Sequence, residues 1–154
     1  ISVINKLLDY YLDDISNNQS FNFRIKFFGD ISYFSKKLQN QITSLEKVNI
    51  NSSYTLNIFL NYGGQEEIAD MVNYFRGSNK TITKVEVDNF FNKKYYPPEL
   101  LIRTGGFKRI SNFILYQLSF TELVFINKLW PDFIISDLNK IISKYETIER
   151  KFGG

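Results

Sequence analysis

Hydrophobic residues recur along the chain with two spacings, and each spacing predicts a type of element. Apolar positions three and four apart over 1–15 indicate a helix, and alternating apolar and polar positions over 21–27 indicate a half-buried strand. The same two patterns predict further strands at 54–60, 100–102 and 123–126, and helices over 31–45, 68–75, 87–91, 111–120 and 138–152. Strands and helices therefore alternate along the chain.

This alternation favours an α/β fold in which a mostly parallel sheet is flanked by helices. No internal repeat, low-complexity segment or linker interrupts the pattern, so we predict one domain over 1–154. The first helical pattern begins at Ile1 with no capping residue before it. We therefore expect the natural protein to continue upstream of Ile1.

Composition narrows the chemistry that this domain can perform. The chain has 154 residues and contains no Cys and no His. Thiolate nucleophiles, disulfides, imidazole bases and the usual zinc sites are thereby excluded. The remaining carboxylates, guanidiniums, ammonium groups and hydroxyls suit phosphate or diphosphate chemistry, in which the positioning of charge does most of the work.

Net charge and hydropathy give weaker information about binding partners than composition gives about chemistry. The formal net charge is +3 and no polybasic tail is present, so we expect no nucleic-acid partner. No apolar stretch reaches the ~18 residues of a membrane span. The compartment stays undetermined between cytoplasmic and organellar.

Two predicted strands end in similar glycine turns, Asn61-Tyr62-Gly63-Gly64 and Arg103-Thr104-Gly105-Gly106. In an open parallel sheet, ligands bind beyond the carboxyl ends of the strands, where glycines let the backbone come close. A glycine pair after a strand is also an ordinary tight turn, so this feature alone is weak evidence.

The run from Leu101 to Phe113 is more specific. It places Arg103, Arg109 and the hydroxyl of Ser111 around a glycine turn, just before the helix predicted to begin at Ser111. Guanidinium groups grip phosphate oxygens with two hydrogen bonds, and free N–H groups at a helix start also favour an anion. The pattern therefore predicts a site for a diphosphate. The alternative is that both arginines pair with nearby acids while Ser111 only caps the helix.

These motifs resemble the cis-prenyltransferase family, which includes the undecaprenyl and dehydrodolichyl diphosphate synthases. The resemblance rests on several motifs in register over essentially the whole chain, namely F-G-D, L-N-I-x-L-N-Y-G-G-x-x-E-I, I-R-T-G-G-x-x-R-I-S-N-F, T-E-L-x-F, L-W-P-D-F and the ending E-R-K-F-G-G. It implies the family fold and the extension of an allylic diphosphate with isopentenyl diphosphate. It also implies Mg²⁺, a homodimer and peripheral membrane association of the enzyme.

The resemblance assigns roles to individual residues. Arg103, Arg109 and Ser111 are expected to bind the diphosphate of isopentenyl diphosphate, and Glu122 to assist magnesium there. Glu122 is puzzling, because a continuous helix from Ser111 would place it about 16 Å away along the axis. A break in the helix, or a contribution across a subunit interface, would resolve this. A helix-end acid that faces solvent is the alternative.

Other positions are expected to support the site or the fold. Asn61, Gly105 and Gly106 belong to the glycine turns, Trp130 is predicted to lie in the core, and Asp132 to organise a helix or loop. Asp9, Asp13 and Asp14 do not have the spacing of the acidic motif in trans-prenyltransferases. We therefore interpret them as a solvated helix face.

The chain departs from the family pattern after its second glycine pair. The family usually has an acid there, followed often by His or Gln, whereas this chain has Phe107 and Lys108. A phenyl ring cannot ligate a metal, and a protonated lysine cannot either. The expected magnesium site is weakened by both substitutions.

The family motif D-G-N-x-R-[WY]-A does not occur in this sequence. The resemblance places the catalytic aspartate in that motif, so none of the catalytic residues is expected in this chain. The chain is then the C-terminal two-thirds of the fold without its N-terminal strand and helix, and we expect it to be inactive alone. Two other functions stay open: a non-catalytic subunit of a heteromeric cis-prenyltransferase, and a phosphate- or RNA-binding α/β module.

Overall fold

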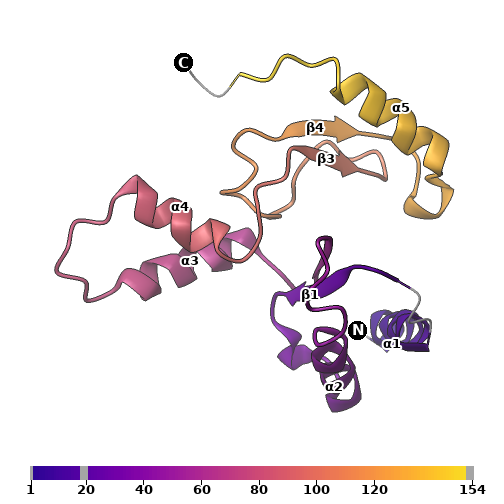
Figure 1. Ribbon diagram of the computed structural model, residues 1–154, viewed down its shortest axis with the longest axis horizontal. Helices are drawn as coiled ribbons and strands as arrows, with labels where there is room; N and C mark the ends of the chain where they lie inside the picture. Colours follow the sequence, from indigo (N-terminus) through magenta and orange to yellow (C-terminus); the bar gives the residue numbers. More distant parts are fainter. Residues whose placement is uncertain (1, 18–20, 152–154) are drawn as a thin grey trace. The chain divides into compact units, whose positions relative to one another are not determined.

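A computed structural model describes residues 2–17 and 21–151 of the chain. The chain forms two compact units, residues 1–62 and 63–154, and each is described here by itself. Both units combine helices with a parallel pair of strands, which confirms the predicted α/β class (Figure 1). Strict alternation holds only in the first unit, because in the second unit β4 follows β3 with no helix between them. The prediction of a single domain stays a prediction.

The first unit is a two-stranded parallel sheet with two helices. Its elements are α1 (Ser2–Asn17), β1 (Arg24–Phe28), the short 3-10 helix η1 (Ile31–Tyr33), α2 (Lys36–Leu45) and β2 (Thr55–Phe59). β1 and β2 pair in parallel from Arg24 opposite Thr55 to Phe28 opposite Phe59. The helix predicted over 31–45 is thus divided. Asp30 caps η1 through the N–H of Ser32, as expected for a capping residue, and Ser35 caps α2.

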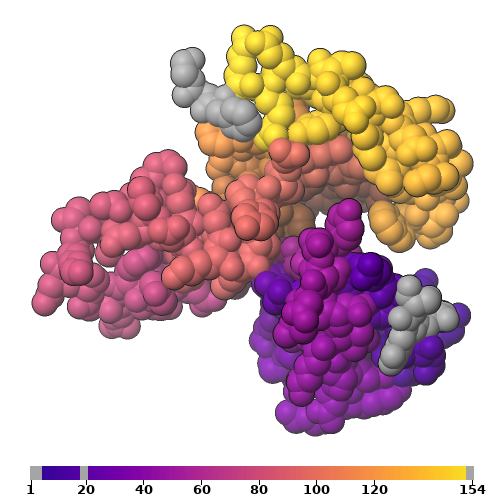
Figure 2. Space-filling model, viewed as in Figure 1, coloured from indigo at the N-terminus to yellow at the C-terminus, as the bar shows by residue number. Residues whose placement is uncertain are grey.

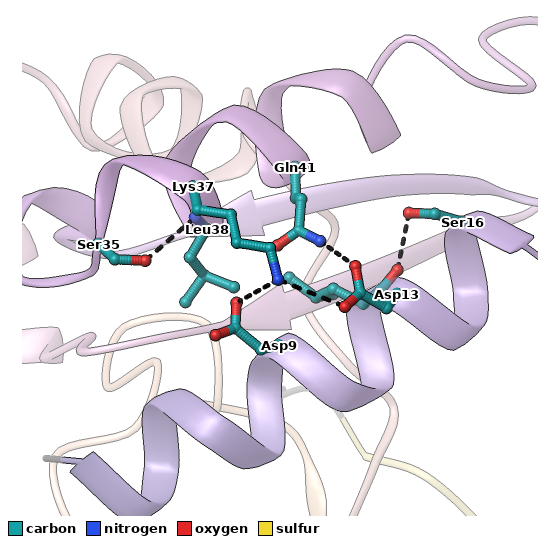
Figure 3. A network of polar contacts seen from close by, with 8 residues as sticks. Asp9, Asp13, Ser16, Ser35, Lys37, Leu38 and Gln41 are labelled. Atoms are coloured by element: carbon teal, nitrogen blue, oxygen red, sulfur yellow. Dashed lines mark hydrogen bonds and ion pairs between the residues drawn. The ribbon is translucent and has the colours of Figure 1, made fainter.

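The core of this unit lies between α1 and α2. Leu12, Leu38, Ile42 and Leu45 are buried there, at the helical spacing seen in the sequence. Polar side chains border the same helix pair (Figure 3). Lys37 of α2 forms ion pairs with Asp9 (3.7 Å) and Asp13 (3.4 Å), and the amide of Gln41 donates to Asp13. These acids therefore face α2 and link the two helices.

The second unit contains the other helices and a second parallel pair of strands. Its elements are α3 (Gly64–Phe75), α4 (Lys84–Asn92), β3 (Leu100–Arg103), β4 (Glu122–Phe125), the 3-10 helix η2 (Trp130–Asp132) and α5 (Ile135–Tyr145). β3 and β4 pair from Leu100 opposite Glu122 to Arg103 opposite Phe125. Both strands end at the same edge, next to the glycine turn of the predicted site.

Aromatic packing and the C-terminal segment stabilise this unit. Phe91 is buried, and its ring stacks on Tyr116 with centroids 4.2 Å apart. In Figure 2 the yellow segment that follows α5 lies against the orange β3–β4 region. Arg150 makes this contact by donating to the carboxylate of Glu99 (2.8 Å) and to the carbonyl of Phe120 (3.3 Å).

The helix predicted over 111–120 is wrong. Ser111, Asn112 and Ile114 have φ of 49°, 62° and 33°, in the left-handed region that a right-handed helix cannot include. The segment forms successive turns instead, and single backbone bonds such as Leu118 N–H to Ile114 O (3.3 Å) replace a continuous ladder. Apolar spacing alone did not reveal this, because burial on several sides of an irregular segment produces the same pattern.

The part of the last predicted helix at Phe152 lies outside the described residues, and α5 ends at Tyr145. Within 2–17 and 21–151, no helix is both long enough and apolar enough to cross a membrane.

Candidate functional site

A glycine turn at the exit of β3 builds the candidate site. Gly105 and Gly106 have φ of +87° and +79°, a conformation that a side chain would strain. Their N–H groups donate to the carbonyls of Lys128 (2.8 Å) and Ile126 (2.9 Å). The turn is thus fixed to the segment that leaves β4, and the residues after it are directed back toward Arg103.

Three predicted side chains meet beyond this turn. Arg103 Nη1 donates to Ser111 Oγ (2.9 Å) and to the carbonyl of Arg109, and Arg109 Nε donates to the same Oγ (3.2 Å). We call Arg103, Arg109 and Ser111 the arginine cradle. The sequence predicted that these three residues lie together, and the structure confirms their proximity.

The cradle is cationic and accessible. No ion pair of Arg103 or Arg109 is found among residues 2–17 and 21–151, which removes the support for the alternative that both pair with nearby acids. Arg109 and Ser111 are exposed, and Arg103 is half-buried. Arg103 donates through Nη1 and Arg109 through Nε, so their other N–H groups have no acceptor among the hydrogen bonds of the described residues. An anion with several oxygens would satisfy these donors.

Phe107 completes the loop. The guanidinium carbon of Arg109 lies 4.3 Å from the centroid of its ring, and that of Arg103 lies 5.8 Å away. Both distances are in the range of a cation–π contact. The ring therefore holds the two cations near one another without neutralising them. Lys108, the next residue, is exposed.

Asn112 is a structural residue that the sequence did not single out. Its carbonyl accepts from Gly64 N–H (2.7 Å), and its side-chain oxygen accepts from Gln65 N–H (2.8 Å). These are N–H groups of the first turn of α3, which a helix leaves without partners. Asn112 thus caps α3 from a distant segment, whereas the helix that was predicted to begin at Ser111 does not form. No local sequence signal identifies such a cap.

The Gly63-Gly64 turn, which alone was weak evidence for a ligand site, lies against another segment of the same unit. A Cβ on Gly64 would lie 2.8 Å from Leu115 Cγ and 3.0 Å from its backbone nitrogen. A Cβ on Gly63 would lie 2.8 Å from the Asn112 amide nitrogen. The glycines therefore allow the chain's own 112–115 segment to approach α3, and the close approach explains them without a ligand.

A buried polar network holds the same segment to α3 and α4. Glu67 of α3 and Gln117 are 5% and 3% exposed, so this carboxylate is one of the few buried in the described chain. Tyr95 Oη donates to Glu67 Oε2 (3.0 Å), and Gln117 Nε2 donates to both Glu67 (3.2 Å) and Tyr95 (3.0 Å). Lys94 adds an ion pair to Glu67 at 3.7 Å. These hydrogen bonds between buried side chains favour one arrangement of the backbone.

Glu122 does not join the cradle in this chain. It begins β4 opposite Leu100, whereas Arg103 lies opposite Phe125 at the other end of the pair. Three residues of strand correspond to about 10 Å. No continuous helix connects Ser111 to Glu122, so the expected helical rise between them does not apply. Glu122 is nevertheless separated from Arg103 by the length of the strand pair. The metal role of Glu122 stays a prediction.

The described residues do not fit a magnesium site at the cradle. Mg²⁺ is bound through carboxylate oxygens, phosphates and water. Among residues 2–17 and 21–151, no group of three or more Asp, Glu, His or Cys side chains could hold a metal. The loop itself supplies Phe107 and Lys108, neither of which is a ligand. We therefore derive no step through a metal at this position.

The prediction that Trp130 lies in the core is wrong. Trp130 is 73% exposed at the start of η2, and its ring stacks on Phe133 at 6.1 Å. In the described chain, the 3-10 turn of three residues that contains Pro131 leaves the Trp130 ring largely uncovered. No hydrogen bond from the Asp132 side chain is found in the described chain, and its N–H donates to the carbonyl of Leu129 (3.0 Å).

Asp137, rather than Asp132, organises this region. Its carboxylate accepts from Lys128 Nζ (2.7 Å) and from the N–H of Ile134 (3.1 Å) at the start of α5. These two hydrogen bonds lower the pKa of the Asp137 carboxyl below its ordinary value, the contact with Lys128 most. The carbonyl of Lys128 accepts from Gly105, so Asp137 supports the cradle turn indirectly.

Asp137→Asn should lower the stability of this unit in a pH-dependent way. Because folding lowers the pKa, the carboxylate stabilises the fold fully above its ordinary pKa of 3.8, and this stabilisation is lost as the pH falls through the lowered value. The difference in Tm between the two proteins should therefore be constant near neutral pH and shrink below about pH 4. Thermal unfolding from pH 2 to 7 checks this, and an unchanged difference at pH 2 would contradict it.

Asn61, predicted to support the site, belongs to the first unit. Its carbonyl accepts from Asp30 N–H (3.2 Å), and its amide donates to the carbonyl of Asp30 (3.3 Å). These bonds join the loops that follow β1 and β2, so in this unit Asn61 is a loop-to-loop link. A direct role at a ligand stays a prediction.

Comparison with known proteins agrees with this fold. The protein family described as "Putative undecaprenyl diphosphate synthase" matches residues 1–153. An isoprenyl transferase from Fusobacterium nucleatum is 37% identical over the whole chain, which covers 68% of that protein. A ditrans,polycis-undecaprenyl-diphosphate synthase from Buchnera aphidicola, described as specific for (2E,6E)-farnesyl diphosphate, is also 37% identical, and the chain covers 65% of it.

Solved structures give the same result. The structure of a "probable undecaprenyl diphosphate synthase" from Campylobacter jejuni superposes with a TM-score of 0.80 at 25% identity, over 99% of this chain and 72% of that one. Lavandulyl diphosphate synthase from Lavandula x intermedia, in complex with dimethylallyl diphosphate, superposes with a TM-score of 0.77 at 28% identity, over 97% of this chain and 68% of that one.

The fold and the cationic turn thus define a parallel α/β protein of the prenyltransferase class. The chain belongs to the undecaprenyl diphosphate synthase family, which confirms the resemblance seen in the sequence. It spans about two-thirds of the length of the curated relatives that it matches. The expectation that it is inactive alone has no support in these matches.

Proposed function

We propose that this chain binds isopentenyl diphosphate through the arginine cradle, as part of a cis-prenyltransferase that extends an allylic diphosphate to a polyprenyl diphosphate. The observation that carries the proposal is that the guanidiniums of Arg103 and Arg109 both donate to Ser111 Oγ at the exit of β3. Neither guanidinium forms an ion pair with a carboxylate in the described chain. A diphosphate concentrates negative charge on several oxygens, and two guanidinium forks with a hydroxyl match that requirement.

The cradle binds and orients the substrate; it does not perform the bond changes. With the diphosphate held, the isopentenyl double bond is directed away from the cations. Its electron pair attacks C1 of the allylic substrate, the C1–O bond breaks, and diphosphate leaves with the electrons of that bond. A proton then passes from C2 of the isopentenyl unit to solvent water, which leaves the new double bond. The contribution of Arg103, Arg109 and Ser111 is therefore orientation.

Several further properties are proposals that rest on family membership. These are a requirement of the reaction for magnesium, assisted by Glu122, a homodimer, and a membrane-peripheral location suited to a long apolar product. The names of two relatives support an allylic diphosphate as one substrate, because they describe those proteins as specific for farnesyl diphosphate and for geranylgeranyl diphosphate.

The test is calorimetric titration of the 154-residue chain with isopentenyl diphosphate, and separately with inorganic phosphate. We expect saturable binding of isopentenyl diphosphate, and binding of phosphate weaker by about a hundred-fold, because the single anion satisfies fewer donors. A transfer assay with radiolabelled isopentenyl diphosphate and farnesyl diphosphate extends the test to elongation. Absence of any uptake of isopentenyl diphosphate would refute the proposal.

A further inference from the structure

Phe107 lies close to both guanidiniums of the arginine cradle, so the side chain at this position affects the net charge of the site. We propose that the arginine cradle captures a diphosphate group without a divalent cation, and that Phe107 is the residue that makes this capture metal-independent. This inference rests on the proposed function, because it concerns the same site. The inference goes beyond the proposed function because it assigns Phe107 a role in the specificity of the site for a diphosphate without bound metal.

The first argument is the closeness of the ring to both cations. Arg109 and Arg103 lie 4.3 and 5.8 Å from the ring centroid of Phe107. The negative face of the ring attracts a guanidinium, but the ring carries no net charge and no oxygen. Phe107 therefore orders two like charges next to one another, and both charges remain available to a ligand.

The second argument is the balance of charge. The described chain contains no ion pair to Arg103 or Arg109, and Lys108 adds a further exposed cation in the same loop. A diphosphate brings two or more negative charges. The protein's own cations can compensate these charges, which elsewhere is the usual task of a bound metal ion.

The third argument is the distribution of carboxylates. A carboxylate in place of the Phe107 ring would lie within reach of both guanidiniums, would compete with the ligand for their donors, and would supply an oxygen ligand for a cation. Glu122 lies at the opposite end of β4, and Asp137 accepts from Lys128. Among residues 2–17 and 21–151, no carboxylate forms an ion pair with Arg103 or Arg109.

The experiment is calorimetric titration of the 154-residue chain with inorganic pyrophosphate, once in EDTA and once in magnesium chloride. We expect wild-type binding in EDTA at least as tight as in magnesium, since the ion also binds pyrophosphate in solution. Phe107→Glu should bind about ten-fold more weakly in EDTA, because the new carboxylate pairs with the guanidiniums, and should recover in magnesium.

Two variants separate charge from stacking. Phe107→Leu removes the ring face without adding charge, and should weaken binding about three-fold in both buffers. Tyr96→Glu adds the same charge at a residue that is 90% exposed and precedes the amino end of β3, and should leave both titrations unchanged. Circular dichroism of each variant establishes that the chain is folded.

The outcomes distinguish this inference from the proposed function. Wild-type binding that requires magnesium would overturn the inference and leave the cradle as a diphosphate site. An unchanged Phe107→Glu affinity in EDTA would also overturn it. No binding of pyrophosphate in either buffer, together with no uptake of isopentenyl diphosphate, would overturn the proposed function as well.

Discussion

Arg103→Ala should reduce the affinity of the chain for isopentenyl diphosphate by about a hundred-fold, because charge-assisted hydrogen bonds each contribute on the order of 1.5–3 kcal/mol. Arg103 Nη1 contacts both Ser111 Oγ and the carbonyl of Arg109. Its loss would remove one cation and also release the other two members of the cradle. Calorimetric titration of wild type and variant measures the ratio.

Arg103→Lys tests whether geometry or charge matters. An ammonium keeps the charge but cannot hold two acceptors in one plane while it presents further donors to a ligand. We expect a loss of about ten-fold, intermediate between wild type and Arg103→Ala. Arg76→Ala is the matched control, because Arg76 is an exposed cation at the far end of α3. Equal affinities for Arg103→Lys and wild type would argue against a fork-like grip.

Glu67→Ala should lower the free energy of unfolding of the second unit by about 3 kcal/mol. The carboxylate is 5% exposed and accepts from Tyr95 and Gln117, so its removal leaves buried donors without their acceptor. Tyr95→Phe keeps the volume and should cost less, about 1–2 kcal/mol. Urea denaturation followed by circular dichroism measures both values.

Asp70→Ala is the control for this prediction, because Asp70 lies on the same helix and is exposed. It should change the unfolding free energy by less than about 0.5 kcal/mol. If Glu67→Ala and Asp70→Ala were equally stable, the buried network would not be a determinant of the fold.

The features that depend on residues close together in the sequence were predictable. The strands at Arg24–Phe28 and Leu100–Arg103 follow from alternating or continuous apolar runs, and Asp30 is a capping residue as expected. The grouping of Arg103, Arg109 and Ser111 was also predictable, because all three lie within nine residues of one turn. Short loops restrict where side chains can go.

The failures concern interactions between distant segments. The helix predicted from Ser111 does not form, because Asn112 instead binds the first turn of α3, which begins at Gly64. Burial of Glu67 depends on Tyr95 and Gln117, which lie 28 and 50 residues further along the chain. Whether Trp130 is buried depends on another element packing over its short turn, and in the described chain the side chain is exposed. Residue spacing carries no information about such partners.

The left-handed backbone at Ser111 restricts which hydroxyl residue the cradle can use. With φ at 49°, a side chain branched at Cβ would collide with its own backbone, whereas the single Oγ of serine is accommodated. Threonine offers the same donor and acceptor chemistry but not the same tolerance. The choice of serine over threonine at this position is thus set by the shape of the main chain rather than by the phosphate it faces.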